Sequence, residues 1–187
     1  MIAKPRTMPQ NLVEQLYSLP ENGKAEIVHG EIVCMSPTGG KPGRTGGKIY
    51  IRLDAYERQT GRGYAFPDNV GFMVNLPNRH SFSPDAAFYR GEVIDEDFLP
   101  GAPIFAVEVR SKNDYGAQAE IAIREKIADY FRAGTQVVWD VDVLRDKLIR
   151  VYRAEEPTNP TIYRRGEMAE AEPALPGWRM AVDEIFK

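Results

Sequence analysis

The chain has 187 residues, of which 43% are hydrophobic and 27% charged, with a formal net charge of −3 at pH 7. We expect residues 1–187 to form a single domain, because this length suits one domain with a sizeable core. The composition excludes a disordered chain, and the net charge excludes a strongly basic protein that coats nucleic acid, although a local patch could still bind phosphates.

The N-terminal part of the chain predicts a hairpin and no signal peptide. Met1–Leu19 lacks the apolar core of such a peptide, and no apolar run approaches the roughly 20 residues that span a bilayer. We therefore expect a cytoplasmic protein with no membrane partner. Two strands at Ala25–Val28 and Glu31–Met35 are joined by a two-residue turn, His29-Gly30.

A glycine-rich loop, Ser36–Gly47, and an amphipathic helix are expected next. Ile49, Leu53 and Tyr56 have the spacing of one helical face, and Gly61 ends the helix. The remaining pattern predicts three strands, a helix, two more strands and a turn-rich tail. Their expected ranges are Tyr64–Asn75, Phe82–Arg90, Ile104–Arg110, Tyr115–Ala133 for the helix, Val137–Val143 and Lys147–Arg153, followed by turns at Glu155–Pro160 and Glu172–Gly177 and a short amphipathic segment at Trp178–Phe186.

The core order of these elements is helix-strand-strand-strand-helix-strand. A helix between two buried strands implies a parallel crossover, so the order predicts an α/β sandwich with a mixed central sheet and an N-terminal hairpin.

One lysine lies where the second main helix should be apolar. At 100° per residue, Ala119, Ile123 and Tyr130 share an arc, and Lys126 falls near its centre. A buried ammonium group is costly unless an anion meets it. One interpretation is that Lys126 reaches past the alanines to solvent; the other is that it meets a buried carboxylate.

Two acidic residues interrupt apolar strands in the same region. Glu108 continues a face formed by Ile104 and Ala106, and Asp85 follows Pro84 in the preceding strand. Separately, Asp85 could be a turn residue and Glu108 a solvated strand end. A single cluster of two carboxylates and a lysine accounts for all three interruptions.

Such a cluster has defined chemistry. Two close carboxylates repel unless a cation lies between them, and hard oxygen ligands suit Mg²⁺ or Mn²⁺. The metal would polarise a phosphate and help to ionise water, and the lysine would orient that water or stabilise charge on the phosphate.

The same residues resemble the restriction-endonuclease-like, PD-(D/E)XK superfamily, whose signature is Pro-Asp followed on the next strand by Asp/Glu-X-Lys. More closely, the chain resembles the Uma-two family of restriction-endonuclease-like proteins. The resemblance runs along most of the chain, in Glu26–Val33 with Met35–Pro37, Ser83–Asp85, Val107–Ser111, Lys126 with Tyr130, Trp139–Asp142, Pro176–Trp178 and Ile185–Phe186. It implies a nuclease fold, a divalent metal held by Asp85 and Glu108, and DNA as the partner.

Arg110 departs from the superfamily pattern, because it stands where the lysine of Glu-X-Lys would be. Arginine cannot act as a base near neutral pH. The resemblance implies that the lysine has moved to the helix, as Lys126. Arg110 would then bind phosphate or form a structural salt bridge, and both alternatives stay open.

Two further features concern the site and its surface. Glu26 and Glu31 share one hairpin face, and we favour Glu31 as an additional carboxylate, with an exposed hairpin edge as the alternative. Arg44, Lys48 and Arg52 recur every four residues and form a candidate nucleic-acid surface, although charge stripes are usually solvated helix faces.

The sequence therefore predicts a Mg²⁺- or Mn²⁺-dependent DNA endonuclease with catalytic residues Asp85, Glu108 and Lys126. The alternative is an inactive descendant of the fold that binds nucleic acid or a protein, and a third is a hydrolase of smaller phosphodiesters. A homodimer or higher homo-oligomer would suit duplex cleavage, but no interface can be recognised in the sequence.

Overall fold

The computed structural model describes residues 10–18, 23–94 and 97–186. Residues 1–9 and 19 of the N-terminal segment considered above lie outside this range. The helices are α1 (Gln10–Tyr17), α2 (Gly40–Thr60), α3 (Ala117–Arg132) and the short 3₁₀ helix η1 (Val182–Phe186). Among the described residues, no helix has the length and apolar character needed to cross a lipid bilayer.

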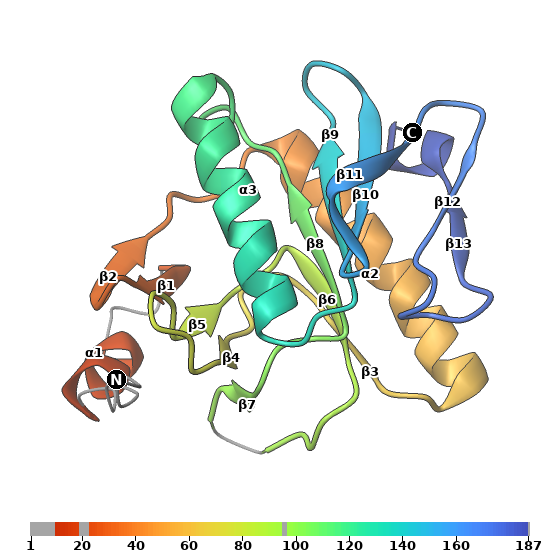
Figure 1. Ribbon diagram of the computed structural model, residues 1–187. Coiled ribbons are helices and arrows are strands. Elements are labelled where there is room, and N and C mark those ends of the chain that lie inside the picture. Colours follow the sequence, from red (N-terminus) through yellow and green to blue (C-terminus); the bar gives the residue numbers. More distant parts are fainter. Residues whose placement is uncertain (1–9, 19–22, 95–96, 187) are drawn as a thin grey trace.

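A six-stranded sheet forms the centre of the molecule (Figure 1). Its strands, in spatial order, are β11 (Glu156–Tyr163), β10 (Leu148–Arg153), β9 (Val137–Asp142), β8 (Phe105–Val109), β6 (Ala86–Tyr89) and β3 (Tyr64–Phe66). β8 and β9 are parallel and the other neighbours are antiparallel, so the sheet is mixed. Along the chain, α2, β3, β6, β8, α3 and β9 follow the predicted order, and the expected α/β sandwich with a mixed sheet is confirmed.

Helices cover the two faces of this sheet, with α3 in front and α2 behind in the view of Figure 1. One apolar cluster lies beneath α3 and includes Ala106, Ile127 and Tyr130. The other includes Ile49 and Leu53 of α2 together with residues of the C-terminal segment. Because both faces are covered, a charged side chain on the inner strands must find a partner inside the protein.

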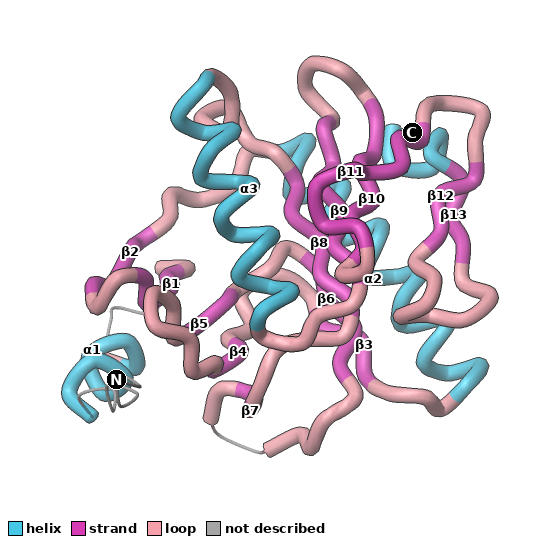
Figure 2. The backbone as a smooth tube through the Cα atoms, viewed as in Figure 1, coloured by secondary structure: helices cyan, strands magenta, loops and turns pink. Residues whose placement is uncertain are grey.

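The smaller pairings lie outside the central sheet (Figure 2). They are the hairpin β1 (Ala25–Val28) with β2 (Glu31–Cys34), the three strands β5 (Ser81–Phe82), β4 (Phe72–Met73) and β7 (Leu99–Pro100), and the pair β12 (Met168–Glu170) with β13 (Arg179–Ala181). In the hairpin, Val28 pairs with Glu31 across the His29-Gly30 turn, as the two-residue loop predicts. The Ile27 N–H donates to Ser81 Oγ at 2.8 Å and thereby fixes the hairpin on the molecule.

Three predicted boundaries were wrong. The strand expected over Tyr64–Asn75 stops at Phe66, because Pro67 removes a donor and the following turn contains Asn69 at φ 66°. The expected loop Ser36–Gly47 is helical from Gly40. The expected turns at Glu155–Pro160 begin β11 instead, whose pairing with β10 contains an irregularity between Val151 and Arg153. At α3 the difference is smaller: the helix begins at Ala117 rather than Tyr115, with Gly116 at its N-cap.

Candidate active site

Asp85 and Glu108 lie at one end of the β6–β8 pair. The register pairs Ala86 with Val107, and Asp85 and Glu108 are the next residues along their strands beyond that pair. The Asp85 N–H donates to the Val107 carbonyl at 2.9 Å, and Asp85 Oδ2 accepts the Val109 N–H at 2.6 Å. Besides burial, the negative charge of Asp85 raises the pKa of Glu108, so the two carboxylates share one small region.

Lys126 reaches this region from α3. Its Nζ is 2.9 Å from Glu108 Oε2, and its side chain is 18% exposed. Tyr130, one helical turn later, donates its hydroxyl to Glu108 Oε1 at 2.6 Å. The structure thus brings together Asp85, Glu108 and Lys126, and each oxygen of Glu108 accepts one hydrogen bond from α3.

A second lysine, Lys24, was not anticipated from the sequence. It lies just before β1, and its Nζ is 2.7 Å from Asp85 Oδ1 and 2.7 Å from Asp68 Oδ1. Its position gives no sequence signal, because it precedes a four-residue strand and belongs to no apolar period. Two ammonium groups therefore flank the two carboxylates, one on each side.

Glu26, and not Glu31, is the hairpin carboxylate that joins this cluster. Glu26 is 3% exposed, and its Oε1 lies 2.9 Å from Lys126 Nζ. Glu31 is exposed on β2, opposite Val28, and the structure does not bring it to the cluster. Of the two hairpin carboxylates, the structure thus brings Glu26 to Lys126 and leaves Glu31 on the surface.

Burial and mutual charge set the pKa values of the cluster. Burial raises the pKa of Glu108; Lys126 opposes this, whereas Asp85 and Glu26 add to it. Burial alone would lower the pKa of Lys126, but Glu108 and Glu26 outweigh it and raise that pKa. Burial tends to raise the pKa of Glu26, yet Lys126 and Arg79 bring it below its usual range. Lys126 is therefore a cation at neutral pH, and Glu108 is protonated more easily than Glu26.

Arg110 belongs to a buried ion network rather than to this cluster. Its side chain is 4% exposed, and its guanidinium forms two 2.7 Å hydrogen bonds to the carboxylate of Asp140 on β9. A second carboxylate, Glu120 on α3, also accepts from it. Of the two alternatives for Arg110, the geometry agrees with the structural salt bridge.

The basic stripe of α2 runs toward the C-terminal segment. Lys48 donates to the Glu184 carbonyl at 3.1 Å, and Arg52 Nε lies 3.5 Å from the Glu184 carboxylate. Arg44, near the start of the helix, is exposed. Gly46 packs against Asp85, whereas Arg44, two residues earlier, lies about 200° around the helix from Gly46. The stripe therefore lies on a different face of α2 from the one that contacts Asp85.

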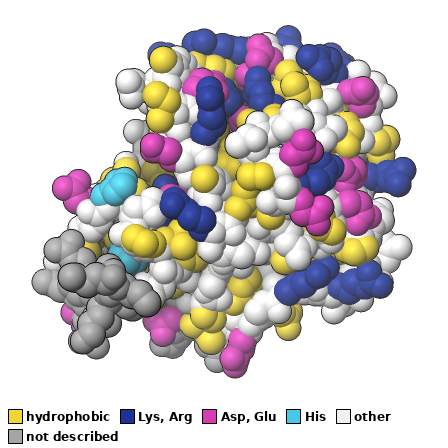
Figure 3. Space-filling model, in the orientation of Figure 1, with side chains coloured by type: hydrophobic (Ala, Val, Ile, Leu, Met, Phe, Trp, Pro, Cys, Tyr) yellow, Lys and Arg dark blue, Asp and Glu magenta, His cyan; other side chains and the backbone are white. Residues whose placement is uncertain are grey.

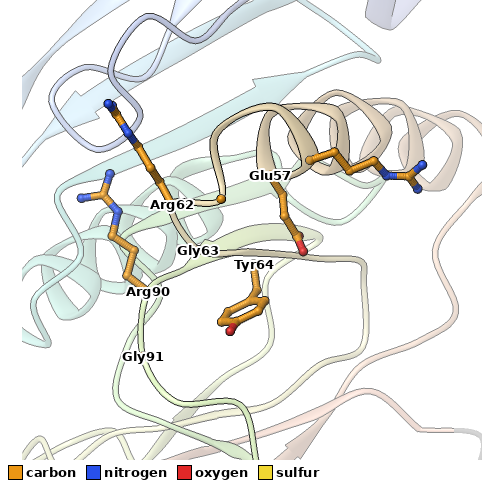
Figure 4. A pocket seen from close by; sticks show the side chains of 8 residues that line it. Glu57, Arg62, Gly63, Tyr64, Arg90 and Gly91 are labelled. Atoms are coloured by element: carbon orange, nitrogen blue, oxygen red, sulfur yellow. The ribbon is translucent and has the colours of Figure 1, made fainter.

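A separate pocket lies at the other end of α2, where the helix passes into β3 (Figure 4). Glu57, Arg62, Tyr64 and Arg90 line it, and none of the clustered carboxylates or lysines does. Glu57 accepts the Ala65 N–H, and Arg90 donates to the Ala174 carbonyl, so two of these charged groups already serve the fold.

The cluster offers two carboxylates for a metal ion. Within the described ranges, no three His, Cys, Asp or Glu side chains form a group that could hold one. Mg²⁺ is commonly bound through one or two carboxylates, with waters and substrate phosphates completing six oxygen ligands. The donor set of Asp85 and Glu108 fits such an open site and does not fit a closed structural metal site.

Comparison with known proteins identifies a family and a shared fold. The Uma2 family, described as "Putative restriction endonuclease", matches residues 13–183. The chain belongs to the Uma2 family. A crystal structure described as a putative nuclease belonging to DUF820, from Anabaena variabilis, has 18% sequence identity to this Uma2 chain and a TM-score of 0.74. The match covers 93% of this chain and 96% of that one, which establishes a shared fold. No curated protein matches the chain at a significant level.

Proposed function

We propose that this Uma2 protein is a Mg²⁺- or Mn²⁺-dependent endonuclease that hydrolyses DNA phosphodiester bonds. The observation that carries the proposal is the convergence of Asp85, Glu108 and Lys126, from two neighbouring strands and a helix, in a chain of a restriction-endonuclease family. Each acid has a lysine partner, Lys24 for Asp85 and Lys126 for Glu108, and the two carboxylates still lie close enough for Asp85 to raise the pKa of Glu108.

Asp85 and Glu108 would hold the metal, which when bound supplies a Lewis acid for the phosphate and lowers the pKa of a bound water. Hydrogen bonds from Val109 N–H and the Tyr130 hydroxyl fix the orientation of the two carboxylates. Lys126 remains charged, so it acts as a hydrogen-bond donor to the attacking water or a phosphate oxygen rather than as a base. In the reaction, a water oxygen bonds to phosphorus and gives up a proton to solvent, the P–O bond to the leaving sugar breaks, and the leaving oxygen takes up a proton from solvent.

The nucleic-acid surface is proposed to include the start of α2 and the basic upper edge of the molecule. The N-cap Gly39 gives no side-chain cap, and no acidic residue lies in the first turn of α2, so its N–H groups are suited to a phosphate. Basic side chains also gather above the start of α3 and the β9–β10 connection (Figure 3). The exposed basic residues of these two connections are Lys112, Arg145 and Lys147. The acidic net charge makes contacts of this local kind necessary.

Cleavage of supercoiled plasmid tests the proposal. The wild type is compared with Asp85→Asn, Glu108→Gln and Lys126→Met in Mg²⁺ and in Mn²⁺, and each variant is expected to lose activity by a factor on the order of 100 or more. Glu31→Gln is the matched control, because Glu31 lies on the surface of the hairpin. Circular dichroism verifies that every variant is folded.

Two results would contradict the proposal. One is the absence of cleavage by the pure wild type in either metal; duplex binding without cleavage would then favour the inactive descendant. The other is equal cleavage by the wild type and Glu108→Gln, which would place the chemistry elsewhere or in a contaminant.

A further inference from the structure

Glu26 is a buried carboxylate to which the proposed chemistry gives no role. It is 3% exposed and lies on β1, outside the strands and helix that carry Asp85, Glu108 and Lys126. An uncompensated carboxylate at such a position would be strongly destabilising. Its partners therefore indicate what it does.

Glu26 and Glu108 hold the Lys126 ammonium from two directions. Lys126 Nζ is 2.9 Å from Glu26 Oε1 and 2.9 Å from Glu108 Oε2. An ammonium group has three N–H donors, so two are directed to the carboxylates and one is left for a substrate or water oxygen. With Glu108 alone, the flexible lysine side chain could rotate about a single contact.

Glu26 is itself fixed on the side away from Lys126. Its Oε1 also accepts the Ser83 N–H at 2.9 Å, and its Oε2 lies 2.5 Å from Arg79 Nη1. Arg79 in turn contacts Asp129 of α3 at 2.9 Å and lies over the Phe82 ring at 5.0 Å. This chain of buried charges connects the hairpin, the segment before β6 and α3, so Glu26 has little freedom to move.

We propose that Glu26 is a positioning residue that holds the Lys126 ammonium in its working direction beside Glu108. This inference rests on the proposed nuclease function and extends it to the N-terminal hairpin. The side chain of Glu26 is 4% exposed, whereas those of Asp85 and Glu108 are 13% and 23% exposed, which separates it from the two carboxylates proposed to hold the metal. The hairpin thus completes the site instead of merely lying beside it.

Glu26→Gln tests this role, because glutamine keeps the shape of the side chain but removes its charge and places a donor NH₂ where one of the three donors now points. The variant is expected to lose about 10- to 100-fold in kcat for plasmid cleavage, with KM changed less than about threefold, because a misplaced catalytic group affects the chemical step. Glu31→Gln on the same hairpin is the control and should leave both constants unchanged.

A second measurement does not depend on catalysis. Acetylation of lysine amines by dilute acetic anhydride, followed by mass spectrometry, compares Lys126 with the exposed Lys147 in each protein. Lys126 should react several-fold more slowly than Lys147 in the wild type, and about fivefold faster in folded Glu26→Gln than in the wild type, because one of its two anchors is gone. Unchanged reactivity of Lys126 in that variant would overturn the proposal. If the wild type does not cleave, the nuclease function fails while the labelling still decides the role of Glu26.

Discussion

Glu108, one of the two proposed metal ligands, lowers the folding stability of the metal-free protein at neutral pH. It is surrounded by Asp85 and Glu26 as well as by Lys126, and burial with these carboxylates raises its pKa despite the lysine. A carboxyl group with a raised pKa binds a proton more tightly in the folded chain than in the unfolded chain. The folded state therefore loses stability as the pH rises through that raised pKa.

Replacing Glu108 with glutamine should consequently stabilise the metal-free protein. In EDTA and low salt, we expect Glu108→Gln to melt a few degrees above the wild type at neutral pH, with a gap that narrows as the pH falls toward the acid range where wild-type Glu108 is protonated. Calorimetry between about pH 4 and pH 8 measures this difference. A variant that melts lower than the wild type at neutral pH would show that the Lys126 ion pair outweighs the carboxylate crowding.

Site residues that interrupt an apolar pattern could be predicted from the sequence. Site residues that interrupt no such pattern could not. Asp85, Glu108 and Lys126 each interrupt a periodic run, and the structure brings them together. Glu26 alternates normally with Ile27 in a short hairpin strand, which resembles an exposed edge in sequence. Only tertiary packing covers both sides of that strand.

At the scale of elements, α2 begins at Gly40, several residues before the point at which the helix propensity of its residues predicts a start. Tertiary packing accounts for this early start. Glycine is a poor helix former, so the run before Ile49 reads as a loop. In the structure a Cβ atom on Gly46 would lie 3.1 Å from the Asp85 carbonyl oxygen. The glycine lets the helix lie directly on the strand end that carries Asp85, whereas the neighbouring Gly47 faces open space.

These two adjacent glycines should respond differently to alanine. Gly47→Ala is expected to raise the free energy of unfolding by about 0.5–1 kcal/mol, because it removes the entropy cost of a helical glycine. Gly46→Ala should give no gain, and Gly46→Val should lose roughly 1–3 kcal/mol by overpacking. Urea unfolding measures all three. An equal gain for alanine at both positions would mean that α2 does not press on Asp85.

At the scale of the whole molecule, the Arg110 network joins parts that are distant in sequence. Arg110 follows β8, Asp140 is on β9 and Glu120 is on α3, so one guanidinium links two central strands to the covering helix. The sequence identified Arg110 as a departure from the superfamily pattern but could not decide its role, because the partners come from elements whose packing is not encoded locally.

Replacing Arg110 alone should lower the free energy of unfolding much more than replacing Arg110 and Asp140 together. Arg110→Met leaves Asp140 buried beside only the more distant Arg150, at 3.5 Å, and we expect a loss of about 3–5 kcal/mol in the free energy of unfolding. The double variant Arg110→Met with Asp140→Leu should recover much of that loss, because Glu120 is 37% exposed to solvent and Arg150 keeps its ion pair with Asp146. Chemical denaturation of the three proteins measures the difference, and a double variant as unstable as the single one would contradict this account.

The outer strand β11 also limits how copies of the molecule can meet. As an edge strand it offers unpaired backbone groups that could template a strand from another chain, yet Pro157 and Pro160 lack N–H donors and the pairing next to them is irregular. The opposite edge, β3, is only three residues long. Continuous sheets across two molecules are therefore disfavoured at both edges. Two copies that cut both strands of a duplex would therefore associate through surfaces other than the edges of the central sheet. The central sheet would then keep the same strands in the monomer and in the assembly.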